Sequence, residues 1–306
     1  MKVKKYDNYS IIEDVKDFDI GQTLECGQCF HFNKIDDNEY AFVSFNNLFA
    51  VKQKNDEIMI NTTDDKKINV LIDYLDLNTN YGHIKKELIK RDDLLREAIE
   101  ANWGIHILNQ EFSETLMSFI ISQNKQIQHI RKIVKGLSER FGEFLGSING
   151  VDYYSFPDID QISNISVDDY KELKTGFRAP YLKDASDKLV YYKASANALS
   201  DDRYIVDKKI KENIFAGMNE EMAREELKKI KGVGDKVANC VNLFSLSYRG
   251  AFPVDVWIKR IMESMYFKRE ASKEEIEKFA LDLYGEYGGY AQQYLFFFGR
   301  ENNLGK

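Results

Sequence analysis

The sequence predicts an α+β protein, with an N-terminal antiparallel β-sheet domain over residues 1–91 and a mostly α-helical domain over residues 92–306. Two observations lead to this prediction. Before residue 62, β-branched and aromatic residues are separated by short polar clusters, which is typical of strands and hairpins. Beyond about Asp92, apolar residues recur at spacings of three and four, which is typical of helices. A chain of 306 residues can bury a sizeable core.

The strongest strand signal is the run EYAFVSFNNLFAVKQKNDEIMIN, from Glu39 to Asn61. It is rich in residues that favour strands and is interrupted at Asn46-Asn47 and again over residues 54–57. Polar clusters of this kind suit hairpin turns, so we expect an antiparallel meander.

The helical signal beyond Asp92 is clearest in two segments. Their apolar residues lie on one face of a helix at the spacings that a helical repeat requires: Leu116, Phe119 and Ile120, then Ile127, Ile130, Val134 and Leu137. All three prolines, Pro157, Pro180 and Pro253, follow this change of pattern, and the last two lie between helical segments.

The chain carries 43 Lys and Arg against 50 Asp and Glu, a formal net charge of −7, which by itself argues against a polyanionic partner. The surplus acid lies mainly in the first hundred residues, whereas residues 125–140 hold five basic residues and one acidic residue. No apolar run approaches the roughly 20 residues of a membrane helix, so we expect a cytoplasmic protein that does not use a membrane.

Three cysteines are too few for a disulfide framework or a four-thiolate zinc site. Cys26-Gly27-Gln28-Cys29 has the CxxC spacing of a redox pair or of half a metal site. No second pair of ligands accompanies it, so two buried, inert thiols are the favoured interpretation, and no metal is predicted.

The segment LKKIKGVGDKVANCVNLF, residues 227–244, predicts two helices joined by a tight turn. Gly232 and Gly234 permit a positive φ and close approach of another backbone, while Val233 between them can enter the core. Amides at the start of the second helix lack helical partners and lie at the positive end of its dipole. The turn therefore suits a phosphodiester, and such binding needs few cationic side chains.

Two residues near this hairpin are candidates for catalysis. Lys236 follows the turn, where the positive helix end and partial burial favour the neutral, nucleophilic amine. A cationic contact with a phosphate is the alternative role. Asp255, in the segment FPVDVW, either caps the following helix or acts in catalysis, or does both.

Together, GVGDKVA and PVDVW resemble the HhH-GPD superfamily of base-excision DNA glycosylases, where HhH denotes helix-hairpin-helix. The pairing of lysine with aspartate resembles the bifunctional glycosylase/lyases, and the likeness to the 8-oxoguanine DNA glycosylase family extends over nearly the whole chain. The resemblance implies removal of 8-oxoguanine from double-stranded DNA through a Schiff base on Lys236, followed by strand nicking, with Asp255 stabilising positive charge on the sugar. It implies no cofactor, and nothing in the sequence requires an obligate protein partner or more than a monomer.

The same resemblance assigns the lesion pocket. In Gly27-Gln28-Cys29-Phe30, the Gly27 carbonyl would accept the N7 hydrogen that distinguishes 8-oxoguanine from guanine. Gln292 would bind the Watson–Crick edge, and Cys240 and Phe296 would form the two walls.

The DNA contacts follow from further matches. Asn124, in FIISQNKQI, would fill the gap left by the flipped base, while Phe177 and Arg178, in GFRA, would wedge the duplex and read the opposite base. His129 stands where eukaryotic relatives place a second, cytosine-reading arginine, so we expect a relaxed preference for the opposite base. Trp257 replaces a phosphate-contacting histidine and would pack or stack instead.

Two other functions compete with this interpretation. A monofunctional alkylbase glycosylase of the same fold would not need Lys236. A non-catalytic helix-hairpin-helix protein would bind DNA without nicking it. The agreement of the lysine, the aspartate and the lesion pocket disfavours both.

Overall fold

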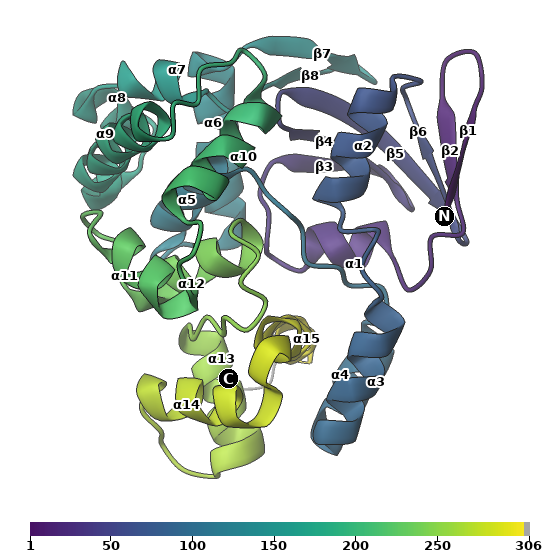
Figure 1. The fold of residues 1–306 in the computed structure, drawn as a ribbon, viewed down its shortest axis with the longest axis vertical. Helices are drawn as coiled ribbons and strands as arrows, with labels where there is room; N and C mark the ends of the chain where they lie inside the picture. Colours follow the sequence, from purple (N-terminus) through teal and green to yellow (C-terminus); the bar gives the residue numbers. More distant parts are fainter. Residues whose placement is uncertain (303–306) are drawn as a thin grey trace.

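The computed structural model describes residues 1–302 and divides into a β-sheet part and a helical part (Figure 1). The predicted helical domain runs to residue 306, so its last four residues lie outside the described chain. The first six strands form one antiparallel sheet in the order β1-β2-β6-β5-β4-β3. Their bounds are β1 Lys2–Lys5, β2 Ser10–Glu13, β3 Phe32–Asp36, β4 Glu39–Ser44, β5 Asn47–Lys54 and β6 Glu57–Ile60.

The hairpins predicted between Glu39 and Asn61 are confirmed. Ser44 pairs with Asn47 across the first turn, and Lys54 pairs with Glu57 across the second. Asn46 and Asn55, at these turns, have φ values of 60° and 53°, a left-handed conformation that asparagine tolerates better than most residues.

The sheet buries one side against short helices. Helix α1, Ile20–Glu25, and helix α2, Asp65–Tyr74, supply apolar residues to a core shared with the inward-facing residues of β2, β4, β5 and β6. Figure 1 shows α2 lying across the sheet. Strands β2 and β6 accordingly bury alternate residues, as the period of two requires, whereas β1 is exposed throughout.

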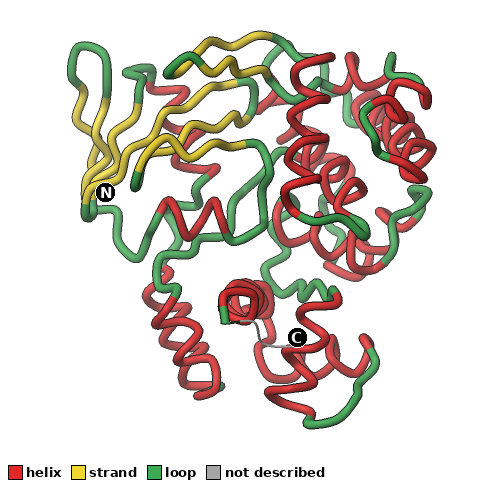
Figure 2. Tube along the Cα trace, turned by 180° about the vertical axis from the view of Figure 1, so that it is seen from behind, coloured by secondary structure: helices red, strands yellow, loops and turns green. Residues whose placement is uncertain are grey.

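Helices dominate the remainder of the described chain (Figure 2). Their bounds are α3 Tyr81–Arg91, α4 Arg96–Ala101, α5 Phe112–Ser122, α6 Ile127–Phe141, α7 Ile159–Ser163, α8 Val167–Glu172, α9 Ala179–Ser195, α10 Arg203–Ile214, α11 Glu220–Lys228, α12 Asp235–Phe244, α13 Val256–Met262, α14 Lys273–Tyr284 and α15 Gly288–Glu301. Short helical turns η1 Asp93–Leu95, η2 Gly176–Arg178, η3 Glu263–Phe267 and η4 Gly285–Tyr287 join some of them.

The apolar faces predicted for α5 and α6 are confirmed, since Leu116, Ile120, Val134 and Leu137 are all fully buried. They belong to a large core that also takes residues from α3, including Leu88. The division of the chain at residues 91 and 92 stays a prediction, because the packing of α3 crosses it.

One β-hairpin interrupts the helical part and was not predicted. Strands β7, Phe144–Ile148, and β8, Val151–Tyr154, pair with each other and lie beside the main sheet (Figure 1). Tyr153 packs there with Ala41 and Val43 of β4. The sequence does not predict this hairpin, because contacts with a strand that is distant along the chain stabilise it.

No helix within residues 1–302 combines the length and apolarity needed to cross a membrane.

Candidate active site

The predicted hairpin is present, with α11 and α12 joined by a tight turn. Gly232 has a φ of +82°, and a Cβ added there would lie 2.3 Å from Cδ2 of Tyr181. Val233 is buried in the core, and Ala238 is fully buried. Backbone conformation and close packing thus both require glycine at position 232.

The first turn of α12 is open to an anion. Gly234 is its N-cap residue, and no side chain caps the helix there. The backbone N–H of Lys231, by contrast, donates to Oδ2 of Asp184 at 2.8 Å and is already occupied. The amides that begin α12 are therefore the remaining candidates for the predicted contact with a phosphate.

Lys236 lies in that first turn and is partly buried. Its Nζ donates to Oγ of Ser122 at 3.3 Å and lies 5.1 Å from the ring centroid of Phe119. The hydroxyl of Ser122 in turn donates to the carbonyl of Phe119 at 2.8 Å. Because that hydroxyl proton is engaged, the Ser122 oxygen presents a lone pair to the amine, so the C-terminal end of α5 orients Lys236.

Asp255 is the N-cap of α13, and its Oδ1 accepts from the backbone N–H of Ile258 at 2.8 Å. The capping role is therefore confirmed. Asp255 also acts on the site electrostatically. Burial raises the pKa of the Cys240 thiol to about 11, Lys236 opposes this rise and Asp255 adds to it. Both candidate catalytic groups therefore act on the Cys240 thiol, which indicates that they lie near it.

The predicted lesion pocket gathers residues from opposite ends of the chain. A Cβ built on Gly27 would lie 3.2 Å from Cε1 of Phe296 and 3.6 Å from Cδ1 of Ile127. Gln292, one helical turn before Phe296, is 5% exposed, and its Oε1 has no hydrogen-bond partner. A buried acceptor without a partner is costly unless a ligand satisfies it, so Gln292 is suited to bind the edge of a base.

The predicted DNA contacts cluster at the end of α5. Asn124 is exposed, with a φ of 49°, and its neighbour Gln123 donates from Nε2 to the carbonyl of Gly232 at 3.1 Å. Phe177 in η2 is 55% exposed, as a wedge requires. The segments predicted to fill the gap and to wedge the duplex thus lie beside the hairpin.

Arg178 is less accessible than its predicted role suggests. It is 4% exposed, it donates to the carbonyls of Gln123 and Thr175, and its guanidinium lies 4.2 Å from the ring centroid of Phe177. Burial lowers its pKa. Reading an orphaned base would require Arg178 to leave at least one of these carbonyls.

The remaining two predicted contacts lie at the surface. His129, in the first turn of α6, is exposed. Trp257, the second residue of α13, is partly buried next to the exposed Val256. Both side chains are therefore accessible to a ligand.

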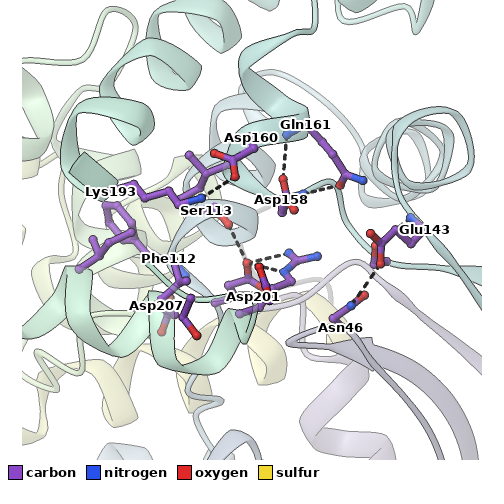
Figure 3. A pocket seen from close by; sticks show the side chains of 17 residues that line it. Asn46, Phe112, Ser113, Glu143, Asp158, Asp160, Gln161, Lys193, Asp201 and Asp207 are labelled. Atoms are coloured by element: carbon purple, nitrogen blue, oxygen red, sulfur yellow. Dashed lines mark hydrogen bonds and ion pairs between the residues drawn. The ribbon is translucent and has the colours of Figure 1, made fainter. Parts of the chain in front are cut away.

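A cavity of about 340 Å³ lies elsewhere, and none of the predicted site residues lines it (Figure 3). Its wall contains the buried ion pair of Arg203 with Glu111, at 2.7 Å, together with Asp158, Asp160 and Asp201. The excess of carboxylates disfavours a phosphate or a nucleic acid. This cavity therefore does not compete with the hairpin as the candidate site for DNA.

Sequence reasoning missed the residues that support the site. Ser122 and Gln123 lie in the segment FIISQNKQI, where the sequence assigns a role only to Asn124, and their contacts with Lys236 and Gly232 span more than a hundred residues. No local pattern signals such contacts.

Comparison with known proteins agrees with this geometry. A family model for the N-terminal domain of 8-oxoguanine DNA glycosylases matches residues 10–116. A second model, for HhH-GPD superfamily base excision DNA repair proteins, matches residues 117–286. The chain belongs to the 8-oxoguanine DNA glycosylase family. The fold class predicted from the sequence, an antiparallel sheet followed by a helical HhH-GPD domain, is thereby confirmed.

Similar proteins of this family have solved structures. The 8-oxoguanine glycosylase/lyase of Clostridium acetobutylicum, in complex with double-stranded DNA containing cytosine opposite the lesion, is 36% identical, with a TM-score of 0.88 and 99% of each chain covered. MBOgg1, in complex with a low-affinity DNA ligand, is 37% identical, with the same TM-score and coverage. The N-glycosylase/DNA lyase of Saccharomyces cerevisiae is 35% identical over 63% of this chain, and the match spans 56% of the yeast protein.

Proposed function

We propose that this family member removes 8-oxoguanine from double-stranded DNA with Lys236 as nucleophile and then nicks the strand by β-elimination. The observation that carries this proposal is the grouping of Lys236, in the first turn of α12 directly beyond the hairpin, with Cys240 of the same helix and Asp255 at the N-cap of α13. The lysine is the feature that a glycosylase needs to be a lyase as well.

In the chemical step, the neutral amine of Lys236 forms a bond to C1′ of the deoxyribose while the bond from C1′ to N9 breaks. The electron pair of the broken bond leaves with the base, which takes up the proton that the attacking amine loses. Ring opening gives a Schiff base, and loss of a proton from C2′ expels the 3′ phosphate. The Asp255 carboxylate stabilises the positive charge that develops on the sugar, and Ser122 orients the amine.

Selection of the lesion rests on the pocket between Cys240 and Phe296. The Gly27 carbonyl accepts the N7 hydrogen of 8-oxoguanine, and Gln292 binds the Watson–Crick edge. Guanine presents an acceptor to that carbonyl, and such an unpaired contact costs about 1–3 kcal/mol. One donor-acceptor match thus provides much of the discrimination.

The nucleotide must leave the helix, which costs a few kcal/mol in unstacking. The α12 amides beyond Gly232 and Gly234 anchor the backbone, Asn124 fills the gap and Phe177 props it open. Arg178 reads the opposite base once it leaves its carbonyl partners. With His129 in place of a second arginine, we propose relaxed selectivity for the opposite base. Trp257 packs or stacks at the position where relatives contact a phosphate.

The protein works as a monomer in this proposal, without an obligate protein partner, and associates with the nucleoid from the cytoplasm. A single chain supplies every residue of the proposed site, which supports the monomer. Light scattering of the protein alone and with an equimolar lesion duplex tests this, and a mass of two chains in either sample would contradict it.

Borohydride reduction tests the nucleophile. Wild type is incubated with a duplex containing 8-oxoguanine and reduced, and we expect a covalent protein–DNA adduct together with free base. Lys236→Gln should give no adduct while still binding the duplex. An adduct with Lys236→Gln, or its absence with wild type, would show that Lys236 is not the nucleophile.

A further inference from the structure

The segment from Glu25 to Cys29, here called the reading turn, carries the carbonyl that is proposed to recognise the lesion. Gly27 within it has a φ of +93°, which residues with a Cβ rarely adopt. The direction of the Gly27 carbonyl therefore depends on an unusual backbone conformation, and that conformation must be held in place by its surroundings.

Gln28 holds the turn from one side. It is fully buried, and its Nε2 donates to the carbonyls of Thr23 at 2.9 Å and of His106 at 2.7 Å. Its Oε1 accepts from the backbone N–H of Leu108 at 2.9 Å, and its own carbonyl accepts from Nε2 of Gln110 at 2.8 Å. These bonds attach the turn to the segment that precedes α5.

Helix α15 holds the turn from the other side. Nε2 of Gln293 donates to Sγ of Cys26 at 3.3 Å, and the Arg300 guanidinium donates to the carbonyl of Glu25 at 2.9 Å. These two residues are seven positions apart, so they lie on one face of α15 about 10 Å apart along its axis. Phe296 lies between them on the same face, and the Arg300 guanidinium is 5.8 Å from its ring centroid.

The two cysteines of the CxxC segment fit this arrangement. All three cysteines are free thiols, and burial raises the pKa of both Cys26 and Cys29. The Cys26 thiol donates to the carbonyl of Thr23 at 3.2 Å and accepts from Gln293. The burial predicted for the two thiols is thus confirmed, and Cys26 contributes a hydrogen-bonding link between the turn and α15.

We infer that Gln293 and Arg300 are positioning residues that fix the Gly27 carbonyl relative to Phe296 and Gln292, and thereby set the discrimination between 8-oxoguanine and guanine. The inference rests on the proposed function, because it gives the reading turn its substrate. Gly27 and Phe296 lie nearly 270 positions apart in the sequence, and the contacts of Gln293 and Arg300 join the reading turn directly to α15. These contacts can therefore hold the spacing between Gly27 and Phe296 to within the tolerance of a hydrogen bond. Arg300 acts through the Glu25 carbonyl and does not touch the base.

Arg300→Met is the main test, because methionine retains a long apolar side chain but cannot donate to Glu25. Arg300→Lys, which keeps one donor, is the matched rescue variant. Gln293→Met removes the second contact independently. Single-turnover rates are measured on three duplexes, containing 8-oxoguanine, unmodified guanine or a preformed abasic site. Nicking at an abasic site needs Lys236 but no base recognition.

We expect Arg300→Met and Gln293→Met to lower 8-oxoguanine excision on the order of tenfold, the scale of one lost hydrogen bond. The rate of abasic-site nicking should change by less than about twofold in both variants. Arg300→Lys should recover most of the lost rate of 8-oxoguanine excision. The ratio of excision rates for 8-oxoguanine over guanine should fall. Equal losses on the lesion and abasic duplexes, or no loss on either, would overturn the inference. Failure of wild type to excise 8-oxoguanine would instead refute the proposed function.

Discussion

Replacing glycine by alanine at three positions around the hairpin separates backbone strain from steric contact. Gly232 has a φ of +82°, and its added Cβ would lie 2.3 and 2.4 Å from Cδ2 and Cγ of Tyr181. Gly217 has a similar φ of +75°, but its Cβ would meet nothing within 4 Å. Gly234 has a φ of −105° and likewise an open surrounding. Gly232 and Gly217 therefore share a positive φ and differ in steric contact, whereas Gly217 and Gly234 share open surroundings and differ in φ.

The expected magnitudes follow from these contacts. A left-handed φ costs alanine about 1–2 kcal/mol, and the lower entropy of the unfolded chain offsets about 0.4–1 kcal/mol of that. Gly217→Ala should therefore destabilise the fold by about 1 kcal/mol. Gly232→Ala adds overpacking against the Tyr181 ring, worth about 1–3 kcal/mol, for a total of about 2–4 kcal/mol. Gly234→Ala carries neither cost.

Urea unfolding measures the stability of each variant, and fluorescence anisotropy measures affinity for a duplex that carries an abasic-site analogue. Gly232→Ala should lose both stability and affinity, because the turn that presents the α12 amides must shift. Gly217→Ala should keep wild-type affinity. Gly234→Ala should keep stability and lose affinity, since its methyl group would lie beside the amides that are proposed to bind the phosphate. A Gly232→Ala variant no less stable than Gly217→Ala would refute the steric argument.

Three further changes test other parts of the molecule. Asp255→Ser keeps an N-cap but removes the charge, so the free energy of unfolding should fall by less than about 1 kcal/mol. The activation free energy of single-turnover excision should rise by about 2 kcal/mol or more, and an unchanged excision rate would exclude a catalytic role. Burial raises the pKa of Glu220 to about 7, so its contribution to stability is complete below its unfolded pKa and is lost as pH rises through 7. Glu220→Gln should therefore flatten the stability profile between about pH 4.5 and 7 by about 1–2 kcal/mol in urea titrations, and an unchanged slope would contradict that shift. Arg203→Met leaves the buried Glu111 carboxylate without its cationic partner, so the free energy of unfolding, measured by thermal unfolding, should fall by about 3–5 kcal/mol. Nicking of abasic sites should be retained. A fall of less than about 1 kcal/mol would mean that solvent reaches the ion pair.

The sequence was sufficient where short-range patterns determine the structure. The Asn46 and Asn55 turns, the buried faces of α5 and α6, and the helices around Gly232 follow from residue types at fixed spacings. The capping role of Asp255 was likewise readable, because a cap involves only residues three positions away. In each case the interacting groups are neighbours along the chain.

Net charge was the least useful guide. The value of −7 by itself pointed away from DNA, yet the chain belongs to a DNA repair family. A hairpin binds phosphate through its amides, which do not enter a count of side-chain charges. A sum over the chain also ignores where the acidic and basic residues lie.

Tertiary structure alone decided the contacts that span the chain. The β7–β8 hairpin depends on packing against β4, Ser122 approaches Lys236 across 114 positions, and Arg178 is buried against carbonyls that no pattern identifies. The pairing of the reading turn with α15 joins residues 267 and 275 positions apart. Sequence by itself determined the local elements and identified the candidate catalytic residues. The fold determined their mutual positions, because hydrogen bonds and packing act over a few ångströms in space, whatever the separation along the chain.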